Sequence, residues 1–284
     1  MSIWTYPDVA SHEFPYAVKG MVVRMGSSEG KRLVNLWNEP ACPFCKEGLF
    51  EVVAEHDREI TASPPPWPDH HDFYSANIEA CPACGWWKAQ YIKRWTNPGG
   101  ICTDVHQGGA SLKELDLTNI SAPIAEVRDY ITARYEGRLS LHPRLFEEVV
   151  GSVFSDLGYS AVVTAYSGDD GIDVILTSGS DTIGVQVKRY KNKISVEQIR
   201  SLAGALVLNG LTRGIFVTTS TFEAGAHSTA DRLGHAGYRI ELLDAPRFYD
   251  ALHLSQRKMY RSWEDFESLQ VIAKLPLVRH LMEH

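Results

Sequence analysis

Three polar residues in the second half of the chain have the types that phosphodiester chemistry needs. Asp173 follows a glycine-containing turn, and Gln186 and Lys188 come after a second turn at Ser178–Asp181. A carboxylate and carbonyl oxygens are ligands that Mg²⁺ prefers, and a lysine ammonium stabilises the negative charge that develops on a phosphate. This combination predicts metal-assisted hydrolysis of a phosphodiester.

A hairpin is expected to bring these three residues together. Side chains alternate along a strand, so Gln186 and Lys188 share one face, and the partner strand places Asp173 on that same face. The apolar residues of the two strands are expected on the other face: Ile172, Val174, Leu176, Val185 and Val187. Spacing alone also allows a hairpin whose polar side chains simply face water.

Four cysteines of the first half form two C-x2-C pairs, Cys42 with Cys45 and Cys81 with Cys84. Each spacing lets both sulfurs of a tight turn face one tetrahedral ion, which predicts a structural Zn²⁺ held by these four residues. The 35 residues between the pairs exceed the spacing of a compact zinc ribbon and are interpreted as an insertion with a proline-rich loop. A redox role for one pair is the alternative.

The first half contains other residues of types that can bind metals, and most of them are interpreted as structural. Cys102 is expected to be a buried apolar residue, although His106 four residues later would allow a second site. His70 and His71 are interpreted as loop residues rather than ligands.

The elements that must position the predicted site follow from apolar periodicity. A helical stripe runs from Phe146 to Leu157, and short apolar runs bounded by turns indicate strands. The predicted order is αβββαβαβ: a helix that ends at Gly158, strands at 161–165, 172–176 and 183–188, a helix at 195–209, a strand at 214–219, a helix at 224–235 and a strand at 238–243.

Composition divides the 284 residues into modules, because six of the seven tryptophans and all five cysteines precede residue 103. Between the modules, a helix capped by Ser121, with Pro123 in its first turn, is expected to end at Gly137. The predicted organisation is a zinc-ribbon-like recognition domain over 1–120, a bridging helix over 121–139, a catalytic domain over 140–255 and a helical extension over 256–284.

Composition and charge narrow the class of protein. With 44% hydrophobic and 22% charged residues, the chain is typical of globular proteins and unlike disordered or coiled-coil ones. It shows no membrane-spanning run and no signal peptide at its start, so a cytoplasmic protein with reduced thiols is expected. The net charge of −7 argues against indiscriminate phosphate binding, so any nucleic-acid site must be local.

Five stretches in order carry a family resemblance: LFEE from Leu145, LGY from Leu157, GDDGIDV, VQVKRY and GIFVTTSTF. Over roughly residues 141–225 the chain resembles the Mrr-type branch of the PD-(D/E)XK nucleases, which includes modification-dependent restriction endonucleases. The resemblance implies an α/β (α+β) fold, a mixed sheet flanked by helices, in addition to the small zinc-ribbon-like domain. It also implies a DNA endonuclease.

The resemblance assigns roles to residues of the site. It implies Asp173 as a Mg²⁺ ligand, Lys188 as the catalytic lysine and Gln186 where most of the superfamily has a glutamate. It further implies that Glu147 of the first helix reaches the site. Because the uncharged Gln186 is a weak ligand, the backbone carbonyl of Val187 is expected to supply a further oxygen to the Mg²⁺. Asp169 and Asp170 are interpreted as turn-formers.

A basic segment directly follows the predicted catalytic strand. Arg189, Lys191 and Lys193 surround Tyr190, which favours phosphate contacts beside the site over a merely solvated loop. Thr219 and Ser220 end a buried strand, where their hydroxyls can bind a phosphate or cap the following helix.

These observations together predict a Mg²⁺-dependent endonuclease that cleaves double-stranded DNA, with a structural Zn²⁺, in defence against foreign DNA. The alternatives are a nuclease effector activated by a signal or partner that the first module senses, a structure-specific nuclease, and a noncatalytic nucleic-acid-binding adaptor. No P-loop signature is present, so no ATP is expected. A homodimer or larger homo-oligomer is expected, with an apolar carboxyl-terminal helix as its candidate interface: Leu269, Ile272, Leu275, Leu277 and Leu281.

Overall fold

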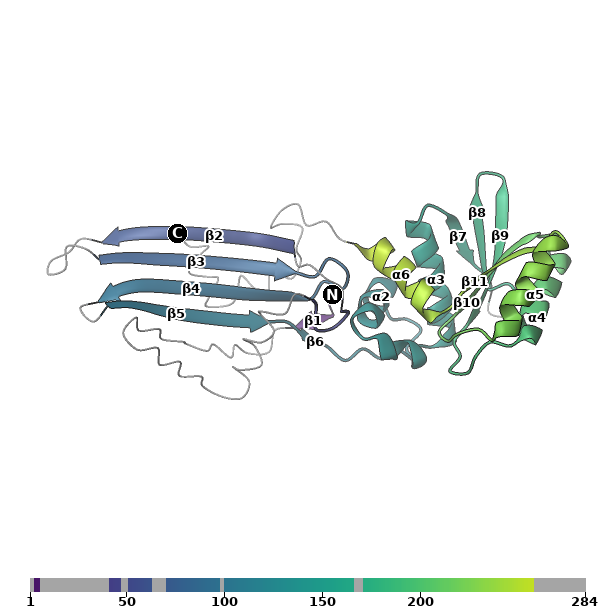
Figure 1. Ribbon diagram of the computed structural model, residues 1–284, viewed down its shortest axis with the longest axis horizontal. Coiled ribbons are helices and arrows are strands. Elements are labelled where there is room, and N and C mark those ends of the chain that lie inside the picture. Colours follow the sequence, from purple (N-terminus) through teal and green to yellow (C-terminus); the bar gives the residue numbers. More distant parts are fainter. Residues whose placement is uncertain are drawn as a thin grey trace. The chain divides into compact units, whose positions relative to one another are not determined.

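The computed structural model describes residues 3–5, 41–46, 51–62, 70–97, 100–165 and 171–257 (Figure 1). One compact unit comprises Glu114–Arg257, and the described residues before Glu114 belong to another. The predicted helix with Leu269 to Leu281 lies outside the described residues. Among the described residues, none of the helices has the length and apolar character needed to cross a membrane.

The first unit is built on a four-stranded antiparallel sheet, with its strands in the order β2-β3-β4-β5 (Figure 1). The strands are β2 (Glu51–Ala62), β3 (His70–Ala80), β4 (Trp87–Asn97) and β5 (Gly100–Gly109). Two short strands, β1 (Trp4–Thr5) and β6 (Ser111–Leu112), pair with each other.

The two histidines predicted to lie in a loop are in fact the first residues of β3. His70 pairs with Ala62 and His71 with Thr61 of β2. The loop interpretation was wrong because the β2–β3 pairing includes His70, His71 and Asp72, where backbone pairing outweighs the turn preference of the aspartate. The proline-rich residues 63–68 themselves lie outside the described residues.

The second unit contains a five-stranded mixed sheet in the order β11-β10-β9-β8-β7. Strands β7 (Ser160–Val163), β8 (Val174–Ser178) and β9 (Asp181–Lys188) form an antiparallel meander, and β10 (Arg213–Thr218) and β11 (Arg239–Leu243) continue the sheet in parallel.

Helices cover both faces of this sheet (Figure 1). Helices α3 (Pro143–Asp156) and α6 (Ala245–Gln256) lie on one face, and α4 (Val196–Leu208) and α5 (Ala224–His235) lie on the other. The order αβββαβαβ and the predicted fold class, a mixed sheet flanked by helices, are therefore confirmed.

Strand β9 lies at the centre of the sheet, so both of its faces are covered. Val185 and Gln186 point to opposite faces and are 0% and 5% exposed. The prediction that Ile172 shares a face with Val174 was wrong. Ile172 precedes β8 and packs with Leu206 of α4. Periodicity fails there since residue 172 lies outside the regular strand.

Helix α2 (Ile124–Ala133) belongs to the second unit, where the sequence predicts a bridge. Arg128 forms an ion pair of 2.6 Å with Asp156 of α3, and Thr132 donates a hydrogen bond of 2.6 Å to Gln256 of α6. The helix begins after Pro123, not at a Ser121 cap, and ends at Ala133. The predicted stop, Gly137, lies inside a following 3₁₀ helix, Tyr135–Leu139, so the chain tightens before it turns.

Candidate active site and candidate metal centre

The backbone of β9 holds the Asp173 carboxylate in place. Asp173 stands directly before β8, and its Oδ2 accepts a hydrogen bond of 2.6 Å from the Val187 backbone N–H. The Asp173 backbone N–H donates in turn to the Val185 carbonyl at 2.8 Å. With 7% of its surface exposed, Asp173 is a buried acid whose orientation is set by strand pairing.

Gln186 lies opposite Asp173, because the β8–β9 register pairs Val174 with Val185. Its side-chain Oε1 is buried and has no hydrogen-bond partner among the described residues. A buried carbonyl oxygen without a hydrogen-bond partner destabilises the fold by about 1–3 kcal/mol. This atom is therefore suited to bind a cation or to accept a hydrogen bond from a ligand. Of the neighbouring turn, Gly171 is described, whereas Asp169 and Asp170 lie outside the described residues.

Lys188 is the last residue of β9 and pairs with Thr218 of β10. It follows Gln186 by two residues, which places it on the same face of the strand. Its carbonyl accepts hydrogen bonds from the Thr218 hydroxyl at 2.9 Å and from the Thr219 backbone N–H at 3.2 Å. The structure therefore brings Asp173, Gln186 and Lys188 to one end of the central strands.

Glu147 lies on α3 and is connected to Asp173 through two residues that the sequence analysis missed. Arg144 donates to Glu147 Oε2 at 3.1 Å and to the Thr164 carbonyl at 2.8 Å. The Thr164 backbone N–H donates to the Asp173 carbonyl at 3.0 Å, and the Thr164 hydroxyl lies 2.8 Å from the Ile172 carbonyl and 3.0 Å from that of Asp173. The spacing of Arg144 three residues before Glu147 was an available signal, but the link through Thr164 is tertiary.

Hydrogen bonds to residues of other elements hold the basic segment that follows β9. Arg189 donates to the Leu139 carbonyl at 2.8 Å, Thr219 Oγ1 donates to the Tyr190 carbonyl at 2.9 Å, and Ser220 Oγ donates to the Lys191 carbonyl at 3.2 Å. Lys191 and Lys193 are exposed. The two hydroxyls thus lie next to the basic segment, as the sequence analysis expects, and they bond its backbone.

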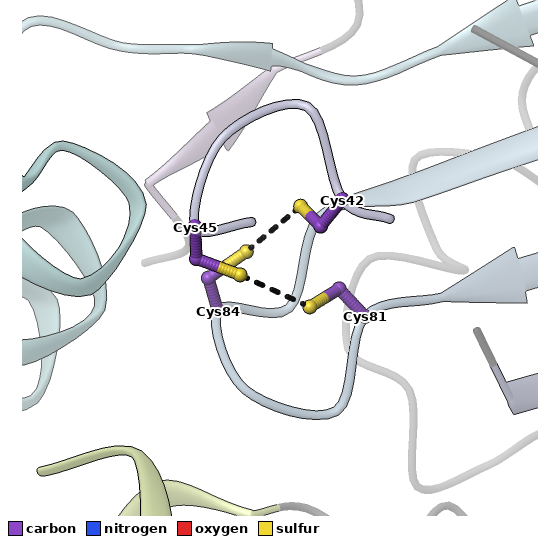
Figure 2. A group of neighbouring side chains, drawn as sticks. All are labelled: Cys42, Cys45, Cys81 and Cys84. Atoms are coloured by element: carbon purple, nitrogen blue, oxygen red, sulfur yellow. Dashed lines mark hydrogen bonds between the residues drawn. The ribbon is translucent and has the colours of Figure 1, made fainter. Parts of the chain in front are cut away.

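The four predicted cysteine ligands converge in the first unit, and Figure 2 shows their sulfurs pointing toward one another from two loops. All four Sγ atoms lie within 4.8 Å of one another, with Cys42 and Cys84 at 3.6 Å and Cys45 and Cys81 at 3.5 Å. Zn–S bonds of about 2.3 Å in a tetrahedron place sulfurs about 3.8 Å apart, so the cluster has the dimensions of a zinc site.

Each cysteine pair sits on the same kind of turn. The Lys46 N–H donates to the Cys42 carbonyl at 3.0 Å, and the Gly85 N–H donates to the Cys81 carbonyl at 2.9 Å. Lys46 and Gly85 both have positive φ, 65° and 74°. Two knuckles of one geometry present their sulfurs to a common centre.

The electrostatics of the cluster favour a cation among the sulfurs. Burial raises the pKa of the Cys84 thiol well above its usual value. Hydrogen bonds lower the pKa of the Cys81 thiol; the bond from Cys42 has the largest effect and the bond from Cys45 the next largest. Four closely spaced sulfurs can all become thiolates when a cation compensates their charge. The side chain of Cys102 is not among those described.

The second unit thus has the fold and polar strand residues of a restriction-endonuclease-like domain. Residues 138–252 match the Mrr_cat family model, described as a restriction endonuclease. This match confirms the predicted resemblance to Mrr-type restriction endonucleases over this part of the chain.

Two curated relatives match parts of the chain. The type IV methyl-directed restriction enzyme EcoKMrr of Escherichia coli is 31% identical over 152 residues, covering 49% of this chain and 50% of that protein. An uncharacterized protein, y4cE, of Sinorhizobium fredii is 32% identical over 143 residues, covering 45% of this chain and 36% of that protein. The chain therefore spans half or less of the length of these relatives.

A solved structure also resembles the chain. The MspJI restriction endonuclease in complex with a 27-mer oligonucleotide covers 95% of this chain and 75% of its own, with 12% identity and a TM-score of 0.31.

Proposed function

We propose that the protein is a Mg²⁺-dependent endonuclease that hydrolyses phosphodiester bonds of double-stranded DNA, as part of a defence against foreign DNA. The observation that carries the proposal is the placement of Asp173, Gln186 and Lys188 at one end of the central strands of a Mrr-type domain. The methyl-directed restriction activity named for the Escherichia coli relative supports DNA as the substrate class.

The donor set at this site fits a hard divalent ion. Asp173 offers a carboxylate, Gln186 offers a buried Oε1 without a described partner, and Val187 offers its backbone carbonyl as the proposed third oxygen. Glu147 is the proposed further ligand from α3. Bound there, Mg²⁺ would polarise a phosphate oxygen and acidify a water molecule.

The protein's own residues have separate tasks in this proposal. The Val187 N–H fixes one oxygen of Asp173, so the carboxylate is oriented before any substrate arrives. Lys188 stabilises the negative charge that grows on the phosphate in the transition state. Lys191 and Lys193, both exposed, and the half-buried Arg189 contact phosphates of the same duplex.

We also propose a structural Zn²⁺ on Cys42, Cys45, Cys81 and Cys84, in the module that recognises the target. The sulfur distances and the paired knuckles support this assignment. Because the cluster joins two loops that are far apart in sequence, the ion would cross-link them and stabilise the module.

The test is to incubate the purified protein and Mg²⁺ with methylated and unmethylated duplex DNA, single strands and RNA. Asp173→Asn is the matched control: it retains an oxygen for the Val187 N–H but removes the charge. We expect duplex cleavage by the wild type and none by this variant, which should melt normally. Cleavage of RNA alone, or of no substrate while the protein still binds DNA, would contradict the proposal and favour another nuclease or an adaptor.

A further inference from the structure

Three consecutive hydroxyls at the end of β10 all point to the chain that leaves β9. Thr218 Oγ1 donates to the Lys188 carbonyl at 2.9 Å, and Thr219 Oγ1 donates to the Tyr190 carbonyl at 2.9 Å. Ser220 Oγ donates to the Lys191 carbonyl at 3.2 Å. We call these three residues the hydroxyl clamp.

The clamp acts where regular strand pairing is interrupted. The β9–β10 pairing ends at Lys188 and Thr218, and a single parallel bridge between Ile194 and Phe222 restores it. The Ile194 N–H donates to the Thr221 carbonyl at 2.9 Å. Residues 189–193 therefore form a short loop, which we call the bow, between two points of backbone pairing. The clamp binds the first half of this loop.

Each hydroxyl of the clamp already donates its one hydrogen bond to a backbone carbonyl. A threonine or serine hydroxyl has one proton, and a phosphate oxygen needs a donor. Since Thr219 and Ser220 already donate to carbonyls, they have no proton left for a phosphate. Thr219 is also only 2% exposed, so a ligand cannot reach it. These hydroxyls therefore act on the bow itself.

The clamped bow presents groups that suit a nucleic-acid strand. Tyr190 is 46% exposed, and Lys191 is exposed next to it, two and three residues after Lys188. The Arg189 side chain donates to the Leu139 carbonyl, so hydrogen bonds hold the bow at residues 188 to 191 in succession. An ordered cation loses less conformational entropy when it binds a phosphate.

We propose that Thr218, Thr219 and Ser220 are positioning residues that fix the backbone of residues 188–191, so that Tyr190 and Lys191 contact the DNA strand beside Lys188 in one geometry. The inference rests on the proposed DNA endonuclease function. It assigns Thr219 and Ser220 to the backbone of the bow, where the sequence alone suggested phosphate contacts.

The first experiment tests the clamp without DNA. Hydrogen exchange of residues 189–193 is compared in the full chain for wild type, Thr219→Val and Ser220→Ala, with Thr219→Ser as the conservative rescue. Ser228→Ala is the matched control, because its exposed hydroxyl donates to the Gly225 carbonyl at 3.2 Å within α5. We expect faster exchange only in Thr219→Val and Ser220→Ala. Unchanged exchange in both would overturn the clamp. Ser220→Ala keeps the test open if Thr219→Val fails to fold.

The second experiment measures binding of a short duplex DNA without Mg²⁺ across a range of salt concentrations. Lys191→Ala in the wild-type background should reduce the salt slope by about 0.9, the value for one lost phosphate contact. In the Ser220→Ala background, the same change should have a clearly smaller effect. An undiminished effect of Lys191→Ala would overturn the DNA half of the inference. If the wild type binds DNA but cleaves none, only the proposed hydrolysis fails.

Discussion

At the scale of single residues, the candidate site contains two side-chain oxygens that differ in their hydrogen bonding. Asp173 Oδ2 accepts from the Val187 N–H at 2.6 Å, whereas Gln186 Oε1 is buried without a described partner. The first atom is already oriented, and the second carries a desolvation cost that a bound cation or donor would remove. This pairing would let an uncharged Gln186 contribute to the proposed metal site.

Replacing Lys188 by alanine should remove cleavage without unfolding the protein. Lys188 is half-buried at the end of β9, and the strand's packing relies on Val185 and Val187 instead. Losing one charge-stabilising group should reduce the cleavage rate by about 10²–10³. Single-turnover cleavage rates and the melting temperature check this prediction, with Arg200→Ala, an exposed cation of α4 outside the proposed site, as control. Near-wild-type turnover of Lys188→Ala would remove Lys188 from the mechanism.

The sequence predicted which polar residues lie together at one end of the strands, but not what orients them. Alternation alone puts Asp173 opposite Gln186 and Lys188, because strand geometry is local and regular. The links through Arg144 and Thr164 depend on how α3 packs on β7 and β8, which periodicity does not encode. Second partners of this kind are visible only in the folded chain.

At the scale of elements, close packing of α4 against β9 and β10 positions the strand that carries Gln186 and Lys188. A side chain at Gly184 would put its Cβ 2.8 Å from Ile172 Cδ1 and 3.0 Å from Leu206 Cδ2. Gly214, its neighbour on β10, would meet Leu206 at 2.8 Å. These two glycines let α4 approach the sheet, so the residue two positions before Gln186 is fixed by packing.

Gly184→Ala should therefore destabilise the second unit, by about 1–3 kcal/mol, since the added methyl overpacks a buried site. The matched control is Gly204→Ala in α4, where a Cβ would meet no atom within 4 Å. That change should stabilise the helix by about 0.5–1 kcal/mol. Urea unfolding of both variants measures the difference. Equal stabilities would show that α4 does not pack closely on Gly184.

At the scale of the whole molecule, two compact units with different sources of stability share one chain. The unit Glu114–Arg257 has a continuous apolar core with Leu202, Leu206 and Phe216 fully buried. In the first unit, the cysteine cluster lies beside Trp86 and Trp87, each 1% exposed. We infer that loss of the metal would affect the first unit selectively.

Elemental analysis should find about one zinc per chain, as expected for a single four-cysteine site. Chelation, or Cys42→Ser or Cys81→Ser, should expose Trp86 and Trp87, while the helical signal of the second unit persists. The physical reason is that zinc binding supplies much of a small module's folding free energy. Tryptophan fluorescence and circular dichroism report the two units, and Cys102→Ser serves as the control that keeps its zinc. Metal-free protein with unchanged fluorescence would contradict the assignment.

The last prediction concerns assembly. The described part of the chain holds one set of Asp173, Gln186 and Lys188, and one such set would hydrolyse one strand under the proposed function. Cutting both strands of a duplex while bound therefore needs two chains, related by a symmetry that matches the duplex. We expect a homodimer or larger assembly in sedimentation with DNA, and linear product from supercoiled plasmid. Mixing wild type with excess Lys188→Ala should make nicked circles accumulate, because mixed dimers cut one strand. A strictly monomeric protein that linearises plasmid without a nicked intermediate would refute the argument.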